Sequence, residues 1–305
     1  MTRHKLRWWD QALRFWFGPV DPIRLDAFRV LIGLALLLYM AAWWRDAREW
    51  LTPIGFHLSA HVIPFAPVVP PLPPSLLLWF GVLFFGSLAA FILGWHATWA
   101  TRIVLGCVTY VSLIDYLASY TINKLFIASF AVLAFVRLGV YWSLTPRPAQ
   151  PQSAWSLRVL QATLLIQYFT AGWCKVAHGD WLKNPYVLWS QIQGIYRTEF
   201  AAWLLHVLPA GVWAWLQYTA LSFELLAPVL FLVKRLRPLG WLWGFGFSLM
   251  IALTMHQLGY FMLQMVSFYV LFMDDRTLHH LWRSIANAGQ GITGSRRRAA
   301  EAKTP

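Results

Sequence analysis

Long apolar stretches set the strongest limit on what this chain can fold into. A helix needs about 20 mostly apolar residues to cross a hydrocarbon core of about 30 Å. We count eight such stretches, at residues 25–44, 75–94, 100–119, 125–142, 157–176, 211–233, 238–257 and 259–273. Because a helix satisfies its backbone hydrogen bonds internally, the sequence predicts an all-α, polytopic membrane bundle of about eight transmembrane helices.

The composition also indicates a lipid environment. Of 305 residues, 59% are hydrophobic and 12% are charged, whereas soluble proteins carry about 25% charged residues. In a soluble protein the net charge of +13 would suggest binding to nucleic acid. With this apolar excess, the charge indicates membrane lipid as the partner, and we expect no nucleic-acid partner.

The basic residues predict the direction of the spans. Most of the 25 Lys and Arg residues share one side if both termini and the loops after the second, fourth and sixth spans are cytoplasmic. This is the bias that the positive-inside rule describes, so we expect a multi-pass protein of the inner (plasma) membrane with both termini in the cytoplasm. The expected regions are an N-terminal interfacial segment at 1–24, a transmembrane domain at 25–280 and a basic cytoplasmic tail at 281–305.

Ionisable residues at helix ends form one candidate site, on the extracytoplasmic side. Lys175 ends the fifth span beside Trp173, and His256 ends the seventh. Asp115 falls at the same depth in the third span, and His178 follows Lys175 closely. Apolar surroundings disfavour the ammonium form of Lys175, so this lysine is a candidate base. The alternative is that Lys175 extends to the headgroups, as helix-end lysines often do.

A second set of ionisable residues is expected deeper in the membrane. Glu224 and Arg137 lie well inside the sixth and fourth spans, and Arg29 lies near the inner end of the first. Buried charges need partners, so we predict a structural ion pair between Glu224 and Arg137 or Arg29. A proton or substrate role for these residues is the alternative. No metal is predicted, because no complete set of ligands can be assigned.

Four segments, in this order, resemble the HTTM (horizontally transferred transmembrane) domain family, which includes the vitamin K-dependent gamma-carboxylase. They are LDAFRVLIGLALLLYMAAWW, which holds Asp26 and Arg29; LQATLLIQYFTAGWCKVAHGDWLKN, which holds a Gly-x-x-Lys pattern ending at Lys175; FELLAPVLFLVKRLRPLG, which holds Glu224; and MHQLGYFMLQMVSFYVLF, which holds His256. The similarity runs from about residue 20 to 280.

The resemblance implies a catalytic role for Lys175. In the carboxylase, the lysine of this pattern is understood to be the base in reduced vitamin K chemistry, in which a hydroquinone is deprotonated, reacts with oxygen and forms an epoxide. That chemistry takes place on the extracytoplasmic face, where the topology independently places Lys175. The carboxylase also has a large lumenal region after its membrane part, whereas this sequence ends soon after the eighth span. We therefore expect the membrane half-reaction, not carboxylation of protein glutamates.

The leading hypothesis is a membrane enzyme, carboxylase- or epoxidase-like, that acts on a quinol or a similar lipid-soluble substrate. Lys175 would be the base and His256 would orient the substrate or relay a proton. The residues expected at the substrate are Tyr168, Trp173, Trp181, Asp115 and His178. One alternative is a non-enzymatic accessory, immunity or maturation protein that binds a membrane or peptide partner. A small-molecule transporter with Glu224 in its path is a further, less favoured alternative.

Overall fold

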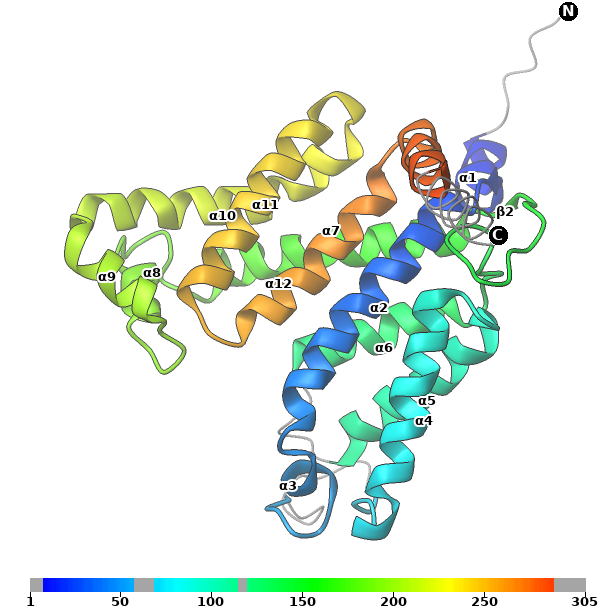
Figure 1. Cartoon of the computed structure of the whole chain (residues 1–305). Coiled ribbons are helices and arrows are strands. Elements are labelled where there is room, and N and C mark those ends of the chain that lie inside the picture. Colours follow the sequence, from blue (N-terminus) through cyan, green and yellow to red (C-terminus); the bar gives the residue numbers. More distant parts are fainter. Residues whose placement is uncertain (1–7, 58–68, 115–119, 288–305) are drawn as a thin grey trace, which may run out of the picture.

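The computed structural model describes residues 8–57, 69–114 and 120–287, and this part of the chain is mainly helical (Figure 1). The helices are α1 (Trp8–Phe17), α2 (Ile23–Trp44), α3 (Ala47–Leu51), α4 (Leu77–Leu93), α5 (Ala97–Ile114), α6 (Thr121–Leu133), α7 (Trp155–Ala177), α8 (Val187–Ile192), α9 (Glu199–Val207), α10 (Ala210–Leu232), α11 (Arg237–Thr254) and α12 (Leu258–Ser267). Short 3₁₀ helices are η1 (Pro74–Leu76), η2 (Lys234–Leu236) and η3 (Phe268–Phe272). Residues 275–287 are also helical.

Two strands of two residues join distant parts of the chain. Strand β1 (Pro19–Val20) pairs antiparallel with β2 (Gln152–Ser153), with Pro19 opposite Ser153. The pairing ties the segment after α1 to the segment before α7. Figure 1 shows α1 and β2 at the same end of the bundle.

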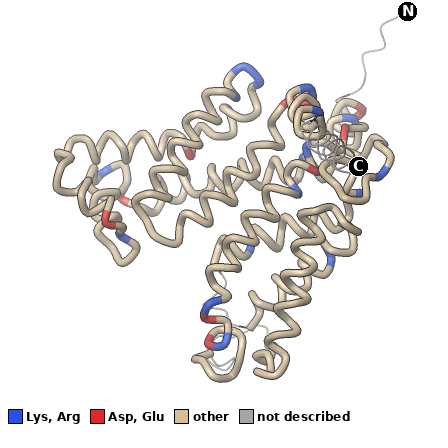
Figure 2. Tube along the Cα trace, viewed as in Figure 1, with Lys and Arg blue, Asp and Glu red and all other residues tan. Residues whose placement is uncertain are grey.

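Five helical stretches in the described part are long and apolar enough to cross a membrane. They are Ile23–Trp44, Pro74–Leu93, Ala97–Ile114, Ala210–Leu232 and Lys234–Thr254. Helix α7 has 23 residues and is long enough to cross a membrane, but it is not among these five stretches. It contains the polar residues Arg158, Gln161, Gln167 and Lys175. Figure 2 shows that most of the helical trace carries no charge. An all-helical fold with several membrane-spanning helices is thus confirmed, while the number of eight spans and the cytoplasmic termini stay predictions.

The predicted fourth span differs most from the structure. Helix α6 has 13 residues and ends at Leu133, so the expected helix over 125–142 is wrong in its second half. Arg137 lies in the following loop instead of a span. Its side chain is exposed, and its guanidinium donates a hydrogen bond of 3.2 Å to Gln150 Oε1. The predicted pairing of Arg137 with Glu224 is therefore wrong.

A buried acid and a buried base at the start of α2 explain why α6 does not continue past Leu133. Asp26 and Arg29 are both 0% exposed. The Asp26 carboxylate accepts three backbone N–H groups at 2.8 Å, from Gly139, Val140 and Tyr141. Arg29 donates to Asp26 and to four backbone carbonyls, those of Phe91, Ile92, Tyr141 and Trp142. Arg29 is thus committed to the loop after α6 and to the end of α4, and its predicted pairing with Glu224 is also wrong.

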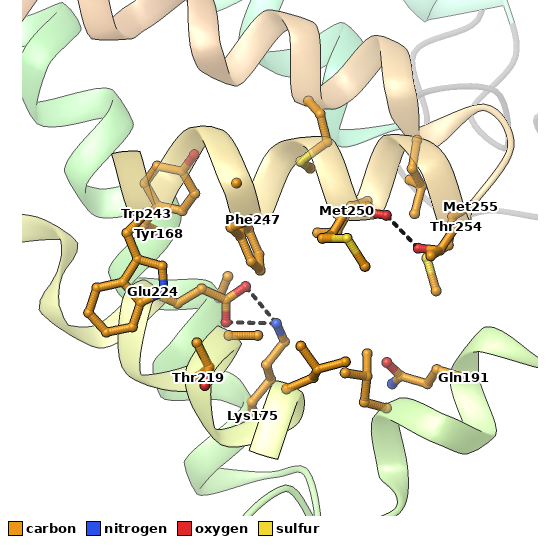
Figure 3. Close-up of a pocket in the computed structure, with 18 of the residues that line it drawn as sticks. Tyr168, Lys175, Gln191, Thr219, Glu224, Trp243, Phe247, Met250, Thr254 and Met255 are labelled. Atoms are coloured by element: carbon orange, nitrogen blue, oxygen red, sulfur yellow. Dashed lines mark hydrogen bonds and ion pairs between the residues drawn. The ribbon is translucent and has the colours of Figure 1, made fainter. Parts of the chain in front are cut away.

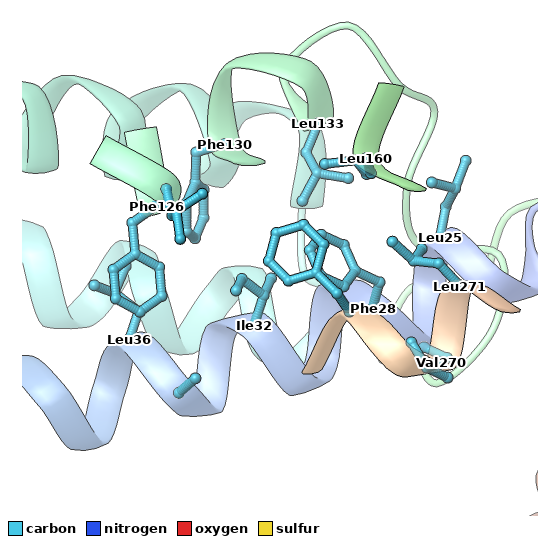
Figure 4. Packing of buried hydrophobic residues seen from close by; sticks show 14 of the residues in the cluster. Leu25, Phe28, Ile32, Leu36, Phe126, Phe130, Leu133, Leu160, Val270 and Leu271 are labelled. Atoms are coloured by element: carbon cyan, nitrogen blue, oxygen red, sulfur yellow. The ribbon is translucent and has the colours of Figure 1, made fainter. Parts of the chain in front are cut away.

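Helix α2 lies at the centre of the main hydrophobic core. Leu25, Phe28, Ile32 and Leu36 recur at helical spacing and are all 0% exposed. Figure 4 shows this face of α2 against a second group of residues: Phe126, Phe130 and Leu133 of α6, Leu160 of α7, and Val270 and Leu271 of η3. Because α2 also contacts α4 and α12, it joins the group of α4, α5 and α6 to the group of α7 and α10–α12 (Figure 1).

The segment between α7 and α10 is folded, and it sets the relative position of those two helices. It contains α8, which packs on α10, and α9, which packs on α11. The first half of α10 lies beside this segment, because Gln217 of α10 contacts residues 181–188 directly. The middle of α10, not its beginning, therefore lies opposite the end of α7.

Candidate functional site

A cavity of about 500 Å³ lies among α7, α8, α10, α11 and α12. Its walls are mainly aromatic and aliphatic, with Trp213, Trp243, Phe247, Met250 and Met262 among the lining residues. Lys175 and Glu224 are the charged residues in the described lining. An apolar cavity of this size with a few polar groups is typical of a small-molecule site.

Lys175 and Glu224 form an ion pair inside the cavity (Figure 3). Lys175 Nζ lies 2.5 Å from Glu224 Oε1 and 2.6 Å from Oε2. The side chains are 27% and 6% exposed, respectively. The ammonium also lies 4.5 Å from the ring centre of Trp181, which is a cation–π distance. The lysine therefore points into the cavity instead of extending to the headgroups.

Gly172 allows the close helix packing that this pair requires. A Cβ atom at Gly172 would lie 3.0 Å from the Cβ of Glu224 and 3.1 Å from the side chain of Leu225. Small residues let helix backbones approach in this way. Lys175 follows three residues later and so lies on nearly the same face of α7. The Gly-x-x-Lys pattern thus consists of a contact point for α10 and, one turn on, the lysine that reaches the Glu224 carboxylate.

Tyr168 lies on the same face of α7, two turns before Lys175. It lines the cavity and is 3% exposed. Its hydroxyl is 2.7 Å from that of Tyr269. This second polar contact places a phenol group in an otherwise apolar wall, between α7 and η3.

Gln217 of α10 holds the segment that carries Trp181. Its side chain is 0% exposed. Nε2 donates to the carbonyls of Trp181 at 2.7 Å and Asn184 at 2.8 Å. Oε1 accepts the N–H of Leu188 at 2.9 Å. The three bonds engage both N–H groups and the oxygen of the amide. They fix the backbone that positions Trp181 beside Lys175.

Replacing Gln217 with Leu is expected to loosen residues 181–188. The backbone groups of Trp181, Asn184 and Leu188 would lose their partner, and an unmet group costs about 1–3 kcal/mol where it is buried. We expect amide hydrogen exchange in this segment to become about tenfold faster or more. Gln167→Leu is the matched control, because Gln167 lines the same cavity but makes no side-chain hydrogen bond to this segment in the described part of the chain. Equal exchange in the two variants would contradict the role of Gln217.

The structure brings together some of the predicted site residues and separates others. Lys175, Tyr168 and Trp181 line the cavity with Glu224. Three predicted residues, Trp173, His178 and His256, are exposed and are not among the described lining residues. The backbone N–H of His256 donates to the carbonyl of Tyr196, in a turn at the end of α11. Asp115 lies outside the described residues.

The expected separation of Lys175 and Glu224 into two depth layers is wrong. Residue counts along each span place Glu224 deeper than Lys175 only if the two helices begin and end at the same level, but α10 starts beyond the end of α7. Sequence reasoning also missed Gln217 and the packing role of Gly172. A signal for Gln217 is present, since an amide in the middle of an apolar span needs a partner.

The fold and the cavity together define a multi-pass membrane protein with an acid–base pair in an apolar chamber. The HTTM domain model matches residues 17–276, most of the chain, and the chain belongs to this family. The resemblance noted in the sequence is thereby confirmed. No curated protein and no solved structure gives a significant match.

Proposed function

We propose that this protein is a membrane enzyme that binds a quinol, or a similar lipid-soluble phenol, in the cavity and deprotonates it. The observation that carries the proposal is the Lys175–Glu224 pair, which supplies acid–base groups to an otherwise apolar chamber. A quinol matches this arrangement, because its ring and tail are apolar and its hydroxyl is an acid. We place the reaction at the extracytoplasmic side of the plasma membrane, in line with the distribution of basic residues in the sequence.

The pair acts as one proton acceptor. The Lys175 ammonium gives a proton to the Glu224 carboxylate, and the resulting amine takes the proton of the quinol hydroxyl. The net products are a quinolate, a Lys175 ammonium beside it, and a neutral Glu224 carboxylic acid. The positive charge then stabilises the quinolate oxygen in a place that excludes water, where electrostatic stabilisation is strong. Lys175 is the base in this scheme, as the resemblance implies, and Glu224 is its proton acceptor.

The proposal predicts that Lys175→Met strongly slows proton removal from a bound quinol. Reduced menaquinone and reduced ubiquinone, added to the protein in nanodiscs, serve as probes. The quinolate is the form that reacts with oxygen, so oxygen consumption reports its formation. We expect the variant to lose about a hundredfold in rate, the usual scale for general acid–base groups.

Two further variants make this experiment decisive. Lys124→Met is the matched control, because Lys124 is an exposed helix lysine, and it should keep the full rate. Glu224→Gln keeps the size of the side chain and removes the proton acceptor, so it should be slow as well. A folded Lys175→Met protein with an unchanged rate would refute the base assignment. Wild-type protein that binds neither quinol would refute the substrate class.

A non-enzymatic partner-binding function is the second candidate, and the surface of α11 favours it. Leu242, Phe245 and Leu249 of this helix are 74%, 54% and 46% exposed. Such a face can contact lipid or another membrane protein. If the protein is an accessory factor, Phe245→Ala and Leu249→Ala should impair its biological role while Lys175→Met leaves that role intact. The enzyme proposal expects the opposite pattern.

A further inference from the structure

A second cavity, of about 550 Å³, lies in the loop that joins α6 to α7. Its walls come from the start and the end of that loop, from β2 and from the first residues of α7. It shares no lining residue with the cavity that holds Lys175. The charged residues of its described lining are Arg137 and Arg147.

The positive charge of this second cavity has no acidic partner within the described residues. The Arg137 guanidinium donates to the neutral amide of Gln150 at 3.2 Å, and the described part shows no ion pair for Arg137 or Arg147. The backbone of Arg137 is held at both groups by Gln152, which accepts its N–H at 3.2 Å and donates to its carbonyl at 2.5 Å. Arg137 is therefore anchored while its charge is uncompensated.

The hydroxyl of a buried serine gives an independent sign of a ligand. Ser156 lines the cavity and is 2% exposed. Within the described residues its hydroxyl has no hydrogen-bond partner. It lies in the first turn of α7, whose N-cap residue Ala154 makes no side-chain cap bond. Helix starts of this kind present free N–H groups and a partial positive charge, so an oxygen anion would satisfy both the hydroxyl and the helix.

The neighbouring helix α1 has the features of a helix that lies at the level of lipid headgroups. The β1–β2 pairing links its wall to α1, which has no buried residue. Helix α1 exposes Trp8, Trp9 and Trp16 at 75%, 57% and 40%, as expected of a helix that lies in the membrane interface. Phe135, 79% exposed, lines the same cavity. An anion that enters this cavity from the bilayer would meet the positive charge of Arg137 and Arg147 inside and the apolar side chain of Phe135 at the edge.

We propose that this cavity binds the phosphate headgroup of an anionic phospholipid. The two guanidinium groups contact the phosphate oxygens, a geometry for which arginine is well suited. The Ser156 hydroxyl donates to the same phosphate, and Phe135 packs against the glycerol and the first acyl carbons. Basic pockets beside membrane helices bind anionic lipid headgroups by the same chemistry. This site is independent of the proposed reaction at Lys175.

The experiment measures lipid retained by the full-length protein. Protein is purified from nanodiscs of phosphatidylcholine with or without phosphatidylglycerol, and bound lipid is counted by native mass spectrometry. We expect retained phosphatidylglycerol in the wild type. Arg137→Gln with Arg147→Gln should weaken its retention about tenfold or more, as expected for loss of charged hydrogen bonds. Ser156→Ala should weaken it less and leaves the charge unchanged.

Arg102→Gln, combined with Arg14→Gln, is the control for net charge. Both residues are exposed arginines outside the cavity, and this variant should retain phosphatidylglycerol. Equal loss in the two double variants would show a general charge effect and overturn the site. Displacement of the lipid by inorganic phosphate at equal concentration would show a site for free anions and would also overturn the lipid assignment.

Discussion

Replacing Asp26 with Ala is expected to cost about 3–5 kcal/mol of folding free energy, the scale for removing one partner of a buried charge pair. Three backbone N–H groups, those of Gly139, Val140 and Tyr141, would lose their acceptor. Arg29 would stay in a fully buried place without a carboxylate. Both losses occur where α2 meets the loop after α6, so the two groups of helices would lose a main connection.

The measurement is the thermal unfolding of the protein in detergent, followed by loss of the monodisperse peak in size-exclusion chromatography. Asp275→Ala is the matched control. Asp275 pairs with Arg24 at 2.7 Å but is 36% exposed, and such surface pairs contribute about 0–1 kcal/mol. The unfolding temperature of Asp26→Asn should lie between those of the two Ala variants. Its amide oxygen still accepts a hydrogen bond, but its amide nitrogen faces backbone N–H donors. If Asp26→Ala and Asp275→Ala were equally stable, the buried contacts would not have the proposed importance.

Much of the fold follows from local sequence patterns, and the pair at Asp26 and Arg29 shows where such patterns fail. The apolar run over 25–44 predicts α2 almost to its ends, because hydropathy and helix length are local properties. The apolar run over 125–142 predicts a helix just as strongly, yet α6 ends at Leu133. What competes with helix formation there is the Asp26 carboxylate, more than a hundred residues earlier, which binds the backbone of the loop. No local pattern contains that contact.

The candidate site was partly predictable for the same reason. The position of Lys175 at the end of an apolar helix, with Tyr168 two turns earlier, follows from helical spacing. Its pairing with Glu224 depends on how far α10 is shifted relative to α7, and that shift is set by the folding of the segment 178–209. Gln217 ties this segment to α10 through its three backbone contacts. The identity of the lysine was therefore accessible from the sequence, and the identity of its partner was not.

Removing one charge of the Lys175–Glu224 pair and removing both are expected to have different effects on stability. Lys175→Met leaves Glu224, 6% exposed, as a carboxylate without its partner. A buried charge left in this way costs about 3 kcal/mol or more, whereas replacing a whole buried pair by apolar residues is often neutral or stabilising. The double variant Lys175→Met with Glu224→Met should therefore recover the unfolding temperature that the single variant loses.

Activity and stability should separate in this double variant, and that separation tests whether the pair exists for chemistry or for packing. An apolar Met–Met contact fills the cavity wall but holds no proton, so we expect wild-type-like thermal unfolding together with quinol oxidation at the background rate. If the double variant recovered both stability and turnover, the pair would be a packing element and the proposed reaction would be wrong. If it recovered neither, the charges would be needed to hold α7 against α10 at Gly172. The rate of oxygen consumption by a folded Glu224→Gln variant would then decide the catalytic role. Stability without activity is the outcome that assigns the chemistry to these two side chains.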